Sequence, residues 1–563
     1  MKKTGAQILC ESLIKEGAEV IFGILGGAIL PVYDTFPQYP QLRHILVRHE
    51  QGAAFAADGY ARATDKVGVC MATSGPGATN LVTGIANAYM DSVPIIAITG
   101  QVARHFIGKD AFQETDITGI TLPITKYNYL VTDARELARI VKEAFYIAQT
   151  GRPGPVHIDI PRDVQMEEVE FVYPDKVNLP GYKFVSRVHP AQIKKAAALI
   201  NSAERPLIIG GRGIIISQAY DELKELAEKA QIPVVTTLLG ISSFPENHIL
   251  SLGMLGMHGM AYANMAVQNA DLIIAIGMRF DDRATGDTRT FAPHARIIHI
   301  DIDPAEIGKN VPVDVPIVGD VRSVLRVMNK EIDRRDHLDW LSQLEQWRQE
   351  HPSLEIREDD KVLPQYIIRQ IYEATQGDAI IVTGVGQNQM WSAQHFIYTK
   401  PNSLLSAGGL GPMGYELPGA MGAKVACPGE LVWSIAGDGG FQMTMQELAT
   451  IAQENIAVKI AIINNGYLGM VRQWQELFYE HRYVATQLQN PDFVKIAEAY
   501  DIPGVRVKRK EEIIPAIYKA IDYPGPFLID FFVEPEENVY PMVPGGGTLS
   551  QMLELPKPEM VSH

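Results

Sequence analysis

Short runs of Ile, Val and Leu alternate with helix-like segments along most of this chain, and this alternation most constrains its fold. Strands covered on both faces read as nearly continuous apolar runs, and parallel strands need a long crossover between them. Because a helix usually makes that crossover, the pattern predicts α/β domains with doubly wound parallel sheets. Examples of the expected strands are residues 45–47, 67–72, 95–99, 156–160, 206–209, 272–276, 297–302, 380–383, 431–435 and 458–463.

Two polar segments interrupt the alternation and divide the chain. Residues 165–189 bear prolines and have no helical period, and residues 334–363 hold a charged helix followed by a polar stretch. Both are expected to be linkers. A chain of 563 residues has room for roughly three or four domains. The predicted domains are residues 1–165, 190–333 and 364–545, followed by a C-terminal tail at 546–563.

Charge and composition limit the partners and the cellular compartment expected for this protein. The formal net charge of −16 argues against nucleic acid or an anionic membrane as the main partner. No apolar run approaches the roughly 20 residues of a membrane span. The first residues read as a helix that starts after Thr4 and stops at Gly17, not as a signal peptide. Three widely spaced cysteines indicate a reduced compartment and no zinc site, so a cytoplasmic protein is expected.

Two motifs in the third segment point to a phosphate ligand. GDGG at 437–440 and NN at 464–465 each follow an expected strand. The carboxyl ends of neighbouring parallel strands share one edge of the sheet, where such sheets bind ligands. Glycines let backbone N–H groups approach a phosphate, and the oxygens of Asp438 and Asn465 are hard ligands suited to Mg²⁺. GDGG alone could be a tight turn, but together the motifs predict a magnesium and phosphate site.

The first and third segments resemble each other faintly. MATSGPGATN at 71–80 and SIAGDGG at 434–440 both place glycines between a strand end and a helix. Two short matches are weak grounds for a repeat. A repeat would give the two segments one fold.

The GDG and NN spacing resembles the metal motif of thiamin diphosphate-dependent enzymes. The resemblance implies that Asp438, Asn465 and the backbone carbonyl of Tyr467 hold Mg²⁺. It also implies two thiamin diphosphate-binding domains on either side of a central FAD-binding domain. The residues it assigns to thiamin diphosphate are Thr73, Pro76, Asn80, Val385, Gly386, Gln387, Asn388, Gly411, Gly437, Gly439, Gly440, Leu468 and Gly469.

RHEQGAAFAADGYAR at 48–62 puts a carboxylate, Glu50, where an apolar strand meets a helix of small residues. An ionised Glu there is expensive to desolvate unless something pairs with it. By the same resemblance, Glu50 binds the pyrimidine ring of thiamin diphosphate and promotes loss of the thiazolium proton. In that superfamily the Glu and the metal motif come from different chains. The alternative is a helix cap or an ion pair with Arg48.

From about residue 4 to residue 550 the chain resembles the large, catalytic subunits of acetolactate synthase. GKDAFQET matches the loop from which a Phe and a Gln enter the active site of that family, here Phe112 and Gln113. The alternative is a capping loop with a core Phe. Met413 would hold the cofactor bent, and Met470 and Trp474 would shape the pocket for the second substrate. Without the resemblance, Met413 and Trp474 read as core residues.

The middle segment resembles the FAD-binding domain of the same family through MLGMHGMAYAN and GMRFDDRATG. Arg279 would also bind the carboxylate of the second keto acid, beside Met257. A surface cluster of ion pairs is the alternative for RFDDR. The residues assigned to FAD are Gly211, Gly213, Thr237, Leu238, Met257, His258, Gly277, Arg279, Asp281, Arg283, Asp301 and Asp320.

The resemblance implies that pyruvate is decarboxylated on thiamin diphosphate and that the remaining two-carbon unit is joined to a second 2-keto acid. Pyruvate as acceptor gives 2-acetolactate, and 2-ketobutyrate gives 2-aceto-2-hydroxybutyrate. These products start branched-chain amino acid biosynthesis. The resemblance also implies a homodimer or tetramer with active sites at the interface, and a small regulatory subunit as a partner.

Three other interpretations stay open. A catabolic acetolactate synthase needs no FAD, a pyruvate oxidase uses its flavin for electrons, and a scaffold of the same fold would have no activity. The RFDDR segment favours the biosynthetic synthase. Two positions depart from the family pattern, namely Ile24-Leu25 in the early loop and Arg162, where relatives carry Lys.

Overall fold

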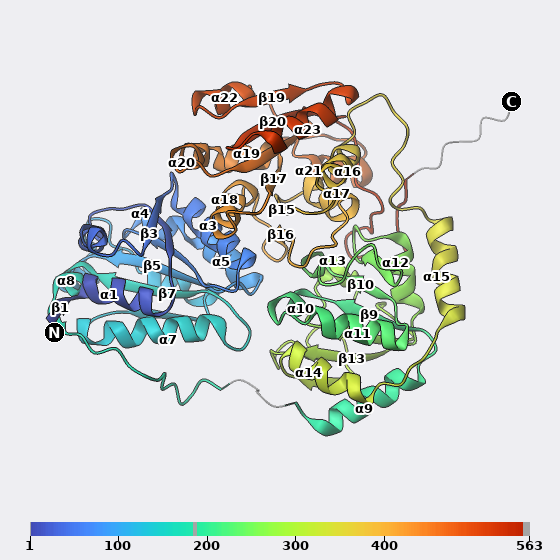
Figure 1. The fold of residues 1–563 in the computed structure, drawn as a ribbon, viewed down its shortest axis with the longest axis horizontal. Helices are drawn as coiled ribbons and strands as arrows, with labels where there is room; N and C mark the ends of the chain where they lie inside the picture. The colour runs from blue at the N-terminus through green and yellow to red at the C-terminus, as the bar shows by residue number, and fades with distance from the viewer. Residues whose placement is uncertain (1, 184–187, 556–563) are drawn as a thin grey trace.

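The computed structural model describes residues 2–183 and 188–555 and contains three six-stranded parallel sheets, one in each predicted domain (Figure 1). The N-terminal sheet, in blue, has the strand order β3-β2-β4-β5-β7-β6. Its strands are β2 (Val20–Gly23), β3 (Arg43–Leu46), β4 (Gly68–Ala72), β5 (Ile95–Gln101), β6 (Tyr127–Leu130) and β7 (Val156–Pro161). The α/β fold class is confirmed.

The C-terminal sheet repeats this topology. Its order is β16-β15-β17-β18-β20-β19, which matches the N-terminal order strand for strand. The repeat suspected from the two short sequence matches is therefore confirmed at the level of strand order. The strands are β15 (Ile380–Thr383), β16 (Leu404–Ser406), β17 (Val432–Gly437), β18 (Val458–Asn464), β19 (Gly504–Val507) and β20 (Phe527–Phe532).

The central sheet is wound differently. Its order is β11-β10-β9-β12-β13-β14, so the winding direction reverses between β9 and β12. This is the order of dinucleotide-binding folds, in which ligands bind in the crevice at the reversal. The strands are β9 (Pro206–Gly210), β10 (Val234–Thr236), β11 (Ser251–Met254), β12 (Leu272–Ile276), β13 (Arg296–Asp301) and β14 (Val315–Val318).

Helices cover both faces of the sheets, as the crossover argument requires. Thr4 caps α1 through a capping box with Gln7, as the sequence predicts, and Gly17 follows the helix end with a φ of +82°. The helices of the N-terminal domain are α1 (Gly5–Lys15), α2 (Leu30–Thr35), α3 (Glu50–Ala63), α4 (Pro76–Asn80), α5 (Val82–Met90), α6 (Ile117–Thr121), α7 (Leu137–Gln149) and α8 (Arg162–Met166).

The other two domains have similar helical layers. The central helices are α9 (Pro190–Ser202), α10 (Arg212–Ile216), α11 (Tyr220–Ala230), α12 (Ala261–Asn269), α13 (Asp282–Thr285) and α14 (Val321–Met328). The C-terminal helices are α16 (Pro364–Thr375), α17 (Gln387–His395), α18 (Glu416–Ala426), α19 (Asp438–Thr444), α20 (Leu448–Gln453), α21 (Gly469–Phe478), α22 (Phe493–Ala499) and α23 (Ile513–Asp522).

The first predicted linker is partly wrong. Residues 165–189 contain β8 (Glu168–Glu170), which pairs antiparallel with β1 (Lys2–Thr4). The strand forms there because the N-terminal residues lie beside this segment and supply its partner. Residues 184–187 of this linker lie outside the described residues. The second linker holds the expected charged helix, α15 (Leu338–Glu350), which buries Trp340 against the central domain. The domain boundaries themselves stay a prediction.

The N-terminal and C-terminal domains meet along two helices of small residues, α3 and α18 (Figure 1). A Cβ atom on Gly59 would lie 2.1 Å from the carbonyl oxygen of Gly419. A Cβ atom on Gly422 would lie 1.9 Å from the carbonyl oxygen of Ala56. The backbones are in contact, so the Gly- and Ala-rich composition of α3 is required by this crossing.

A buried ionic cluster stabilises the same interface. Arg62, on α3, pairs with Asp58 and, at 2.8 Å, with Asp91, and all three side chains are buried. The Tyr415 hydroxyl of the C-terminal domain donates to Asp58 at 2.8 Å. Asp91 in turn accepts the backbone N–H of Gly409 at 2.7 Å. Removing one member would leave a buried charge unpaired, which makes the interface specific.

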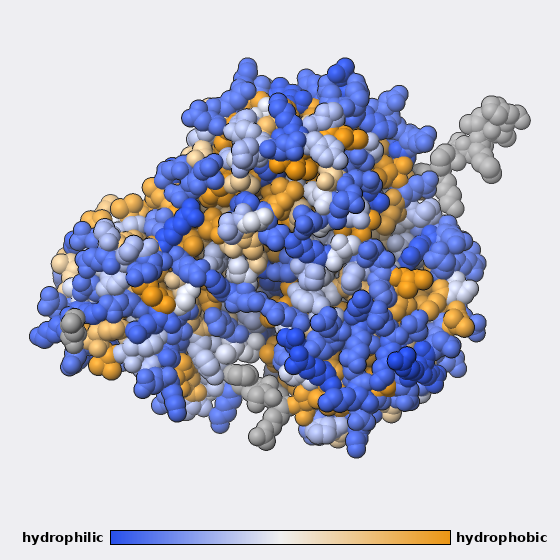
Figure 2. All heavy atoms as spheres, in the orientation of Figure 1, coloured by the Kyte–Doolittle hydropathy of each residue, from blue (hydrophilic) through white to orange (hydrophobic). Residues whose placement is uncertain are grey.

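The outer surface shown in Figure 2 is mostly hydrophilic. No helix in the described part of the chain is long and apolar enough to cross a membrane. All three cysteines are free, and burial raises the pKa of the Cys10 and Cys70 thiols to about 12. Neither buried thiol is therefore a ready nucleophile.

The α3–α18 crossing makes a testable prediction. Gly422→Ala should lower the free energy of unfolding by about 1–3 kcal/mol, because its methyl group meets the backbone of α3. This loss outweighs the gain of about 1 kcal/mol that Ala brings to a helix interior. Urea unfolding followed by circular dichroism measures the change. Gly429→Ala is the control, since no atom lies within 4 Å of its added Cβ. Equal stability of the two variants would contradict the close packing.

Candidate active site

Glu50 is the first residue of α3, as its place after the strand predicts. Its Oε2 atom accepts a hydrogen bond from the Asn80 side chain at 3.0 Å. The alternatives are wrong, because His49 is the N-cap and the Arg48 guanidinium bonds to the Leu46 carbonyl and to Gln453. The carboxylate has no basic partner among the described residues.

Thr73, Pro76 and Asn80 lie on the neighbouring loop after β4 and on α4, close to Glu50. A Cβ atom on Gly77 would lie 3.2 Å from Glu50 Oε1 and 2.8 Å from the Thr73 methyl group. Gln113 packs against Gly75 of the same loop and has a φ of +59°. The structure thus brings together the predicted cofactor residues of the N-terminal domain.

Phe112 differs from the core residue considered as an alternative. Its side chain is 88% exposed, the largest exposed fraction among the large hydrophobic residues of the described chain. The loop beneath it is well ordered by hydrogen bonds, because Glu114 accepts the backbone N–H of Ala111 at 3.0 Å. Phe112 is therefore not a core residue of this chain, and its ring is free to contact another group.

Asp438 and Asn465 lie together at the carboxyl edge of the C-terminal sheet, as predicted. Asp438 begins α19, and its Oδ2 atom accepts from the backbone N–H of Gly466 at 2.8 Å and from the Asn490 amide at 2.6 Å. Burial raises the pKa of the Asp438 carboxyl to about 6. Within the described chain no Lys or Arg pairs with the Asp438 carboxylate. A bound cation would supply the positive charge that favours its ionised form.

A chain of buried amides fixes Asn465. Its Nδ2 atom donates to Gln387 Oε1 at 3.1 Å, and the Gln387 amide donates to Gln473 at 2.9 Å. A Cβ atom on Gly469 would lie 2.1 Å from Gln387 Oε1, so this chain needs glycine there. Asn465 Oδ1 accepts the Tyr467 backbone N–H at 3.0 Å, so the two proposed metal-ligand residues are in direct contact.

The remaining predicted diphosphate residues surround this edge. Asn388 donates from its amide to the Ile435 carbonyl at 2.9 Å, beside Gly437. A Cβ atom on Gly439 would meet Leu468 at 2.8 Å and the Met413 methyl group at 3.3 Å. Met413 therefore lies against the GDGG loop and is not a buried core residue. Gly386 has a φ of +123°, which glycine adopts readily.

One large cavity of about 1110 Å³ opens where the three domains meet. It lies at the carboxyl ends of β9 and β12, at the reversal of the central sheet. It joins most of the predicted FAD residues to part of the predicted thiamin diphosphate and substrate residues. Its predicted members are Gly213, Thr237, Leu238, Met257, His258, Gly277, Arg279, Asp281, Arg283, Asp301, Asp320, Val385, Gly386, Gly411, Met470 and Trp474.

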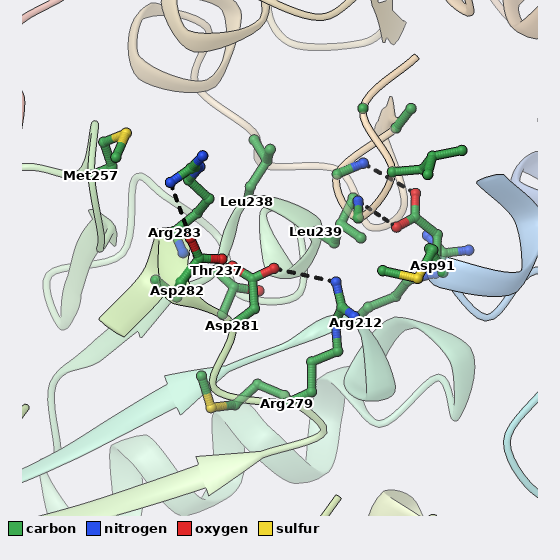
Figure 3. Close-up of a pocket in the computed structure, with 18 of the residues that line it drawn as sticks. Asp91, Arg212, Thr237, Leu238, Leu239, Met257, Arg279, Asp281, Asp282 and Arg283 are labelled. Carbon is green, nitrogen blue, oxygen red and sulfur yellow. Dashed lines mark hydrogen bonds and ion pairs between the residues drawn. The ribbon is translucent and has the colours of Figure 1, made fainter. Parts of the chain in front are cut away.

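Basic groups line this cavity (Figure 3). Arg279 pairs with Asp281 at 3.2 Å and Arg283 with Asp282 at 3.0 Å, so RFDDR does form ion pairs, but within the cavity wall. Arg212 projects into the same space, and its Nε atom is buried without a hydrogen-bond partner in the described chain. Burial lowers the pKa of the Arg212 guanidinium to about 10, which favours an anionic ligand nearby.

The glycines next to these arginines are required mainly because two backbone loops pass close to each other. A Cβ atom on Gly211 would lie 2.2 Å from the Gly277 carbonyl oxygen, and one on Gly213 would lie 2.6 Å from Gly277 Cα. The loops after β9 and β12 therefore touch. Among the described residues, Gly211 is absent from the cavity lining, whereas Gly213 and Gly277 are present.

A C-terminal strap, residues 541–545, packs behind three residues that line the cavity. Met257 and Val543 pair through their backbones at 2.8 Å, and His258 Nδ1 lies 3.2 Å from the Pro541 carbonyl. Burial lowers the pKa of His258 to about 4, so its ring is neutral near pH 7. Trp474 packs beneath the same strap, 3.0 Å from the position of a Cβ on Gly545.

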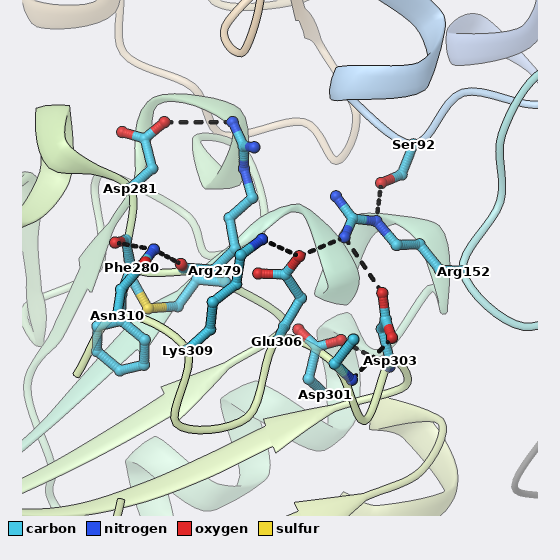
Figure 4. A network of polar contacts seen from close by, with 12 residues as sticks. Ser92, Arg152, Arg279, Phe280, Asp281, Asp301, Asp303, Glu306, Lys309 and Asn310 are labelled. Carbon is cyan, nitrogen blue, oxygen red and sulfur yellow. Dashed lines mark hydrogen bonds and ion pairs between the residues drawn. The ribbon is translucent and has the colours of Figure 1, made fainter. Parts of the chain in front are cut away.

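The N-terminal domain closes the far wall through Arg152 (Figure 4). Its guanidinium bonds Glu306 at 2.7 Å, Asp303 at 3.3 Å and the Ser92 hydroxyl at 2.8 Å. Burial raises the pKa of the neighbouring Asp301 carboxyl to about 6. The predicted acidic loop after β13 is thus tied to a different domain.

The predicted site residues of the N-terminal domain have no direct contact with the metal motif in the described chain. In the described structure, neither the cavity lining nor any hydrogen bond joins Glu50, Thr73 or Gln113 to Asp438. Sequence reasoning missed Arg152, Asn490, Glu416 and Glu447. In the sequence, each of these is a charged or amide residue within an apolar or glycine-rich stretch. The role of such a residue can be inferred only once the structure shows its partners.

Known protein families match all three domains of this chain. The N-terminal TPP binding domain of thiamine pyrophosphate enzymes matches residues 3–120, the central domain matches 193–328, and the C-terminal TPP binding domain matches 384–531. Fold and matches define the class as a thiamine pyrophosphate (thiamin diphosphate) enzyme.

Curated relatives narrow the class. An acetolactate synthase of Mycobacterium bovis is 52% identical, with 96% of this chain and 90% of the relative covered. The large subunit from Corynebacterium glutamicum is 51% identical (98% and 90% covered), and that from Pyropia yezoensis is 50% identical (99% and 96% covered). The chain belongs to the family of acetolactate synthase large subunits.

Glu416, behind the GDGG loop, predicts a pH effect. It is fully buried, neither carboxylate oxygen has a hydrogen-bond partner in the described chain, and burial raises its pKa to about 7. The unfolded chain releases this proton at lower pH, so wild-type stability falls as pH rises toward 7. Glu416→Gln should therefore gain in melting temperature over wild type between about pH 5 and pH 8.

Thermal melts across this pH range make the comparison. Glu498→Gln, at an exposed position, is the control and should follow wild type at every pH. A constant difference between Glu416→Gln and wild type would mean that the Glu416 carboxyl has the same pKa in the folded and the unfolded chain, which would contradict the prediction.

Proposed function

We propose that this chain decarboxylates pyruvate and joins the remaining two-carbon unit to a second 2-keto acid, either pyruvate or 2-ketobutyrate. The products are 2-acetolactate and 2-aceto-2-hydroxybutyrate, the first committed compounds of branched-chain amino acid biosynthesis. The observation that carries this proposal is the edge at Asp438 and Asn465, a buried acidic and amide pair beside glycine loops. It fits a diphosphate held through Mg²⁺.

The proposed metal ligands are Asp438, Asn465 and the Tyr467 carbonyl. All three are oxygen donors, which suit Mg²⁺. Asp438 is buried and lacks a basic partner in the described chain. The hydrogen bonds from Gly466 and Asn490 both go to its Oδ2 atom. A divalent cation would supply the missing positive charge and tie the diphosphate to the sheet edge.

FAD is the proposed occupant of the cavity in the central domain. The strand order there is that of dinucleotide-binding folds, and the unpartnered Arg212 Nε suits a diphosphate. Asp301 and Asp320 follow or end central strands, where carboxylates accept from ribose hydroxyls. The proposed net reaction involves no electron transfer, so the flavin is assigned here by fit alone.

Thiamin diphosphate supplies an electron sink for the carbon that loses CO₂. Glu50 is proposed to hydrogen-bond a nitrogen of its pyrimidine ring and to share with it the proton needed for activation. Gln113 and Phe112 are proposed to bound the reacting carbons, and Met413 to support the bent cofactor. Arg279 would bind the acceptor carboxylate, with Met257, Met470 and Trp474 around its alkyl group; all four line the cavity.

An active site shared between two copies of the chain is part of the proposal. No hydrogen bond joins Glu50 to Asp438 within the described chain, and Phe112 is exposed. A homodimer or tetramer would cover Phe112 and bring Glu50 of one copy to the metal edge of the other. The relatives named large subunits suggest a small regulatory partner. A cytoplasmic location is proposed from composition.

Product analysis tests the proposed reaction. The purified chain with pyruvate, thiamin diphosphate, Mg²⁺ and FAD should form acetolactate, and removal of FAD should abolish most of it. An absorption spectrum of the FAD-free sample serves as the control for retained flavin. Acetolactate without any flavin would indicate the catabolic synthase, and acetate formed with flavin reduction would indicate a pyruvate oxidase; either result contradicts the proposal.

A further inference from the structure

The turn that presents Glu50 is held from another domain. Glu447 ends a short 3-10 helix, η7 (Met445–Glu447), between α19 and α20 of the C-terminal domain. Its carboxylate accepts the backbone N–H groups of Arg48 and His49, each at 3.0 Å. The Thr450 hydroxyl donates to its other oxygen at 2.7 Å. Because α3 begins at the next residue, Glu447 fixes the backbone turn that leads into the helix whose first residue is Glu50.

The surroundings are shaped for this carboxylate. Glu447 is fully buried, and a Cβ atom on Gly52 would lie 2.5 Å from its Oε1 atom. Gly52 thus leaves the space that the carboxylate fills. Burial raises the Glu447 pKa, whereas the two backbone donors and Thr450 favour the ionised form. A negative charge is also favoured at the N-terminus of a helix such as α3.

We infer that Glu447 is a positioning residue that sets the place and angle of Glu50. The inference rests on the proposed function, in which Glu50 binds the cofactor. Asn80 holds the carboxylate end of Glu50, and Glu447 holds the backbone at the start of its helix. The two contacts come from different domains, so the angle of Glu50 depends on the α3–α18 interface. No contact joins Glu447 to the cavity in the described chain, which separates positioning from direct binding.

Variants of Glu447 test this inference in the holoenzyme. Glu447→Ala should lower kcat by about 100-fold, the effect of a misplacement on the order of 1 Å, with the pyruvate KM changed less than about twofold. Glu447→Gln keeps a carbonyl acceptor and should lose less than about tenfold. Gly52→Ala should mimic Glu447→Ala by driving the carboxylate away. Hydrogen exchange of residues 46–54, measured without cofactor or substrate, should speed up in Glu447→Ala.

The decisive comparison uses a Glu50→Gln background. If Glu447 acts through Glu50, adding Glu447→Ala to Glu50→Gln should change kcat by less than about twofold, since the effects are not additive. A 100-fold loss in both backgrounds would mean a general structural role and overturn the inference. Wild-type kcat in Glu447→Ala and Gly52→Ala would overturn it too.

Two further outcomes distinguish failure of this inference from failure of the proposed function. If Glu50→Gln turns over like wild type, the assignment of Glu50 fails and the inference fails with it. If Glu50→Gln is inactive while Glu447→Ala is not, only the inference fails. Glu454→Ala is the matched control. Its carboxylate also reaches the N-terminal domain, at Arg43 3.0 Å away, but not the turn before Glu50, and its kcat should stay at the wild-type value.

Discussion

The contact of α3 with α18 is the constraint on which the rest of the structure depends. Glycine and alanine let two helices from different domains touch backbone to backbone. That contact fixes the N-terminal sheet against the C-terminal sheet, and it carries Glu50 at the start of α3 and Glu416 at the start of α18. The small residues after Glu50 are therefore a packing requirement, and this packing positions the carboxylate that is proposed to bind the cofactor.

Buried charge divides into two kinds in this molecule. Arg62 is surrounded by Asp58, Asp91 and Tyr415, and this closed cluster stabilises the domain interface. Asp438, in contrast, has no basic partner within the described residues, and Arg212 forms no salt bridge there and has a buried Nε atom without a hydrogen bond. A buried charge without a partner is costly unless a ligand supplies one. The two open charges lie where a cation and an anionic cofactor are proposed to bind.

The sequence predicted the fold well because its signals are local. Continuous apolar runs at 272–276 and 380–383 became strands with those same bounds. β8 was missed because a three-residue strand is stabilised only by its partner β1, a contact distant in sequence. The GDGG and NN motifs met at one edge because neighbouring parallel strands end there. Glu447 and Arg152 could not be found in advance, since each gains its meaning from a partner in another domain.

The central claim is that a complete active site needs Glu50 from one copy and Asp438 from another. Two chains with different affinity tags, one carrying Glu50→Gln and the other Asp438→Ala, can be co-expressed and the mixed dimer isolated by both tags. In that dimer one of the two sites would hold both native residues, so the account predicts about half of the wild-type acetolactate synthesis. Activity no higher than that of either parent variant would place both residues in a site within one chain and contradict the account.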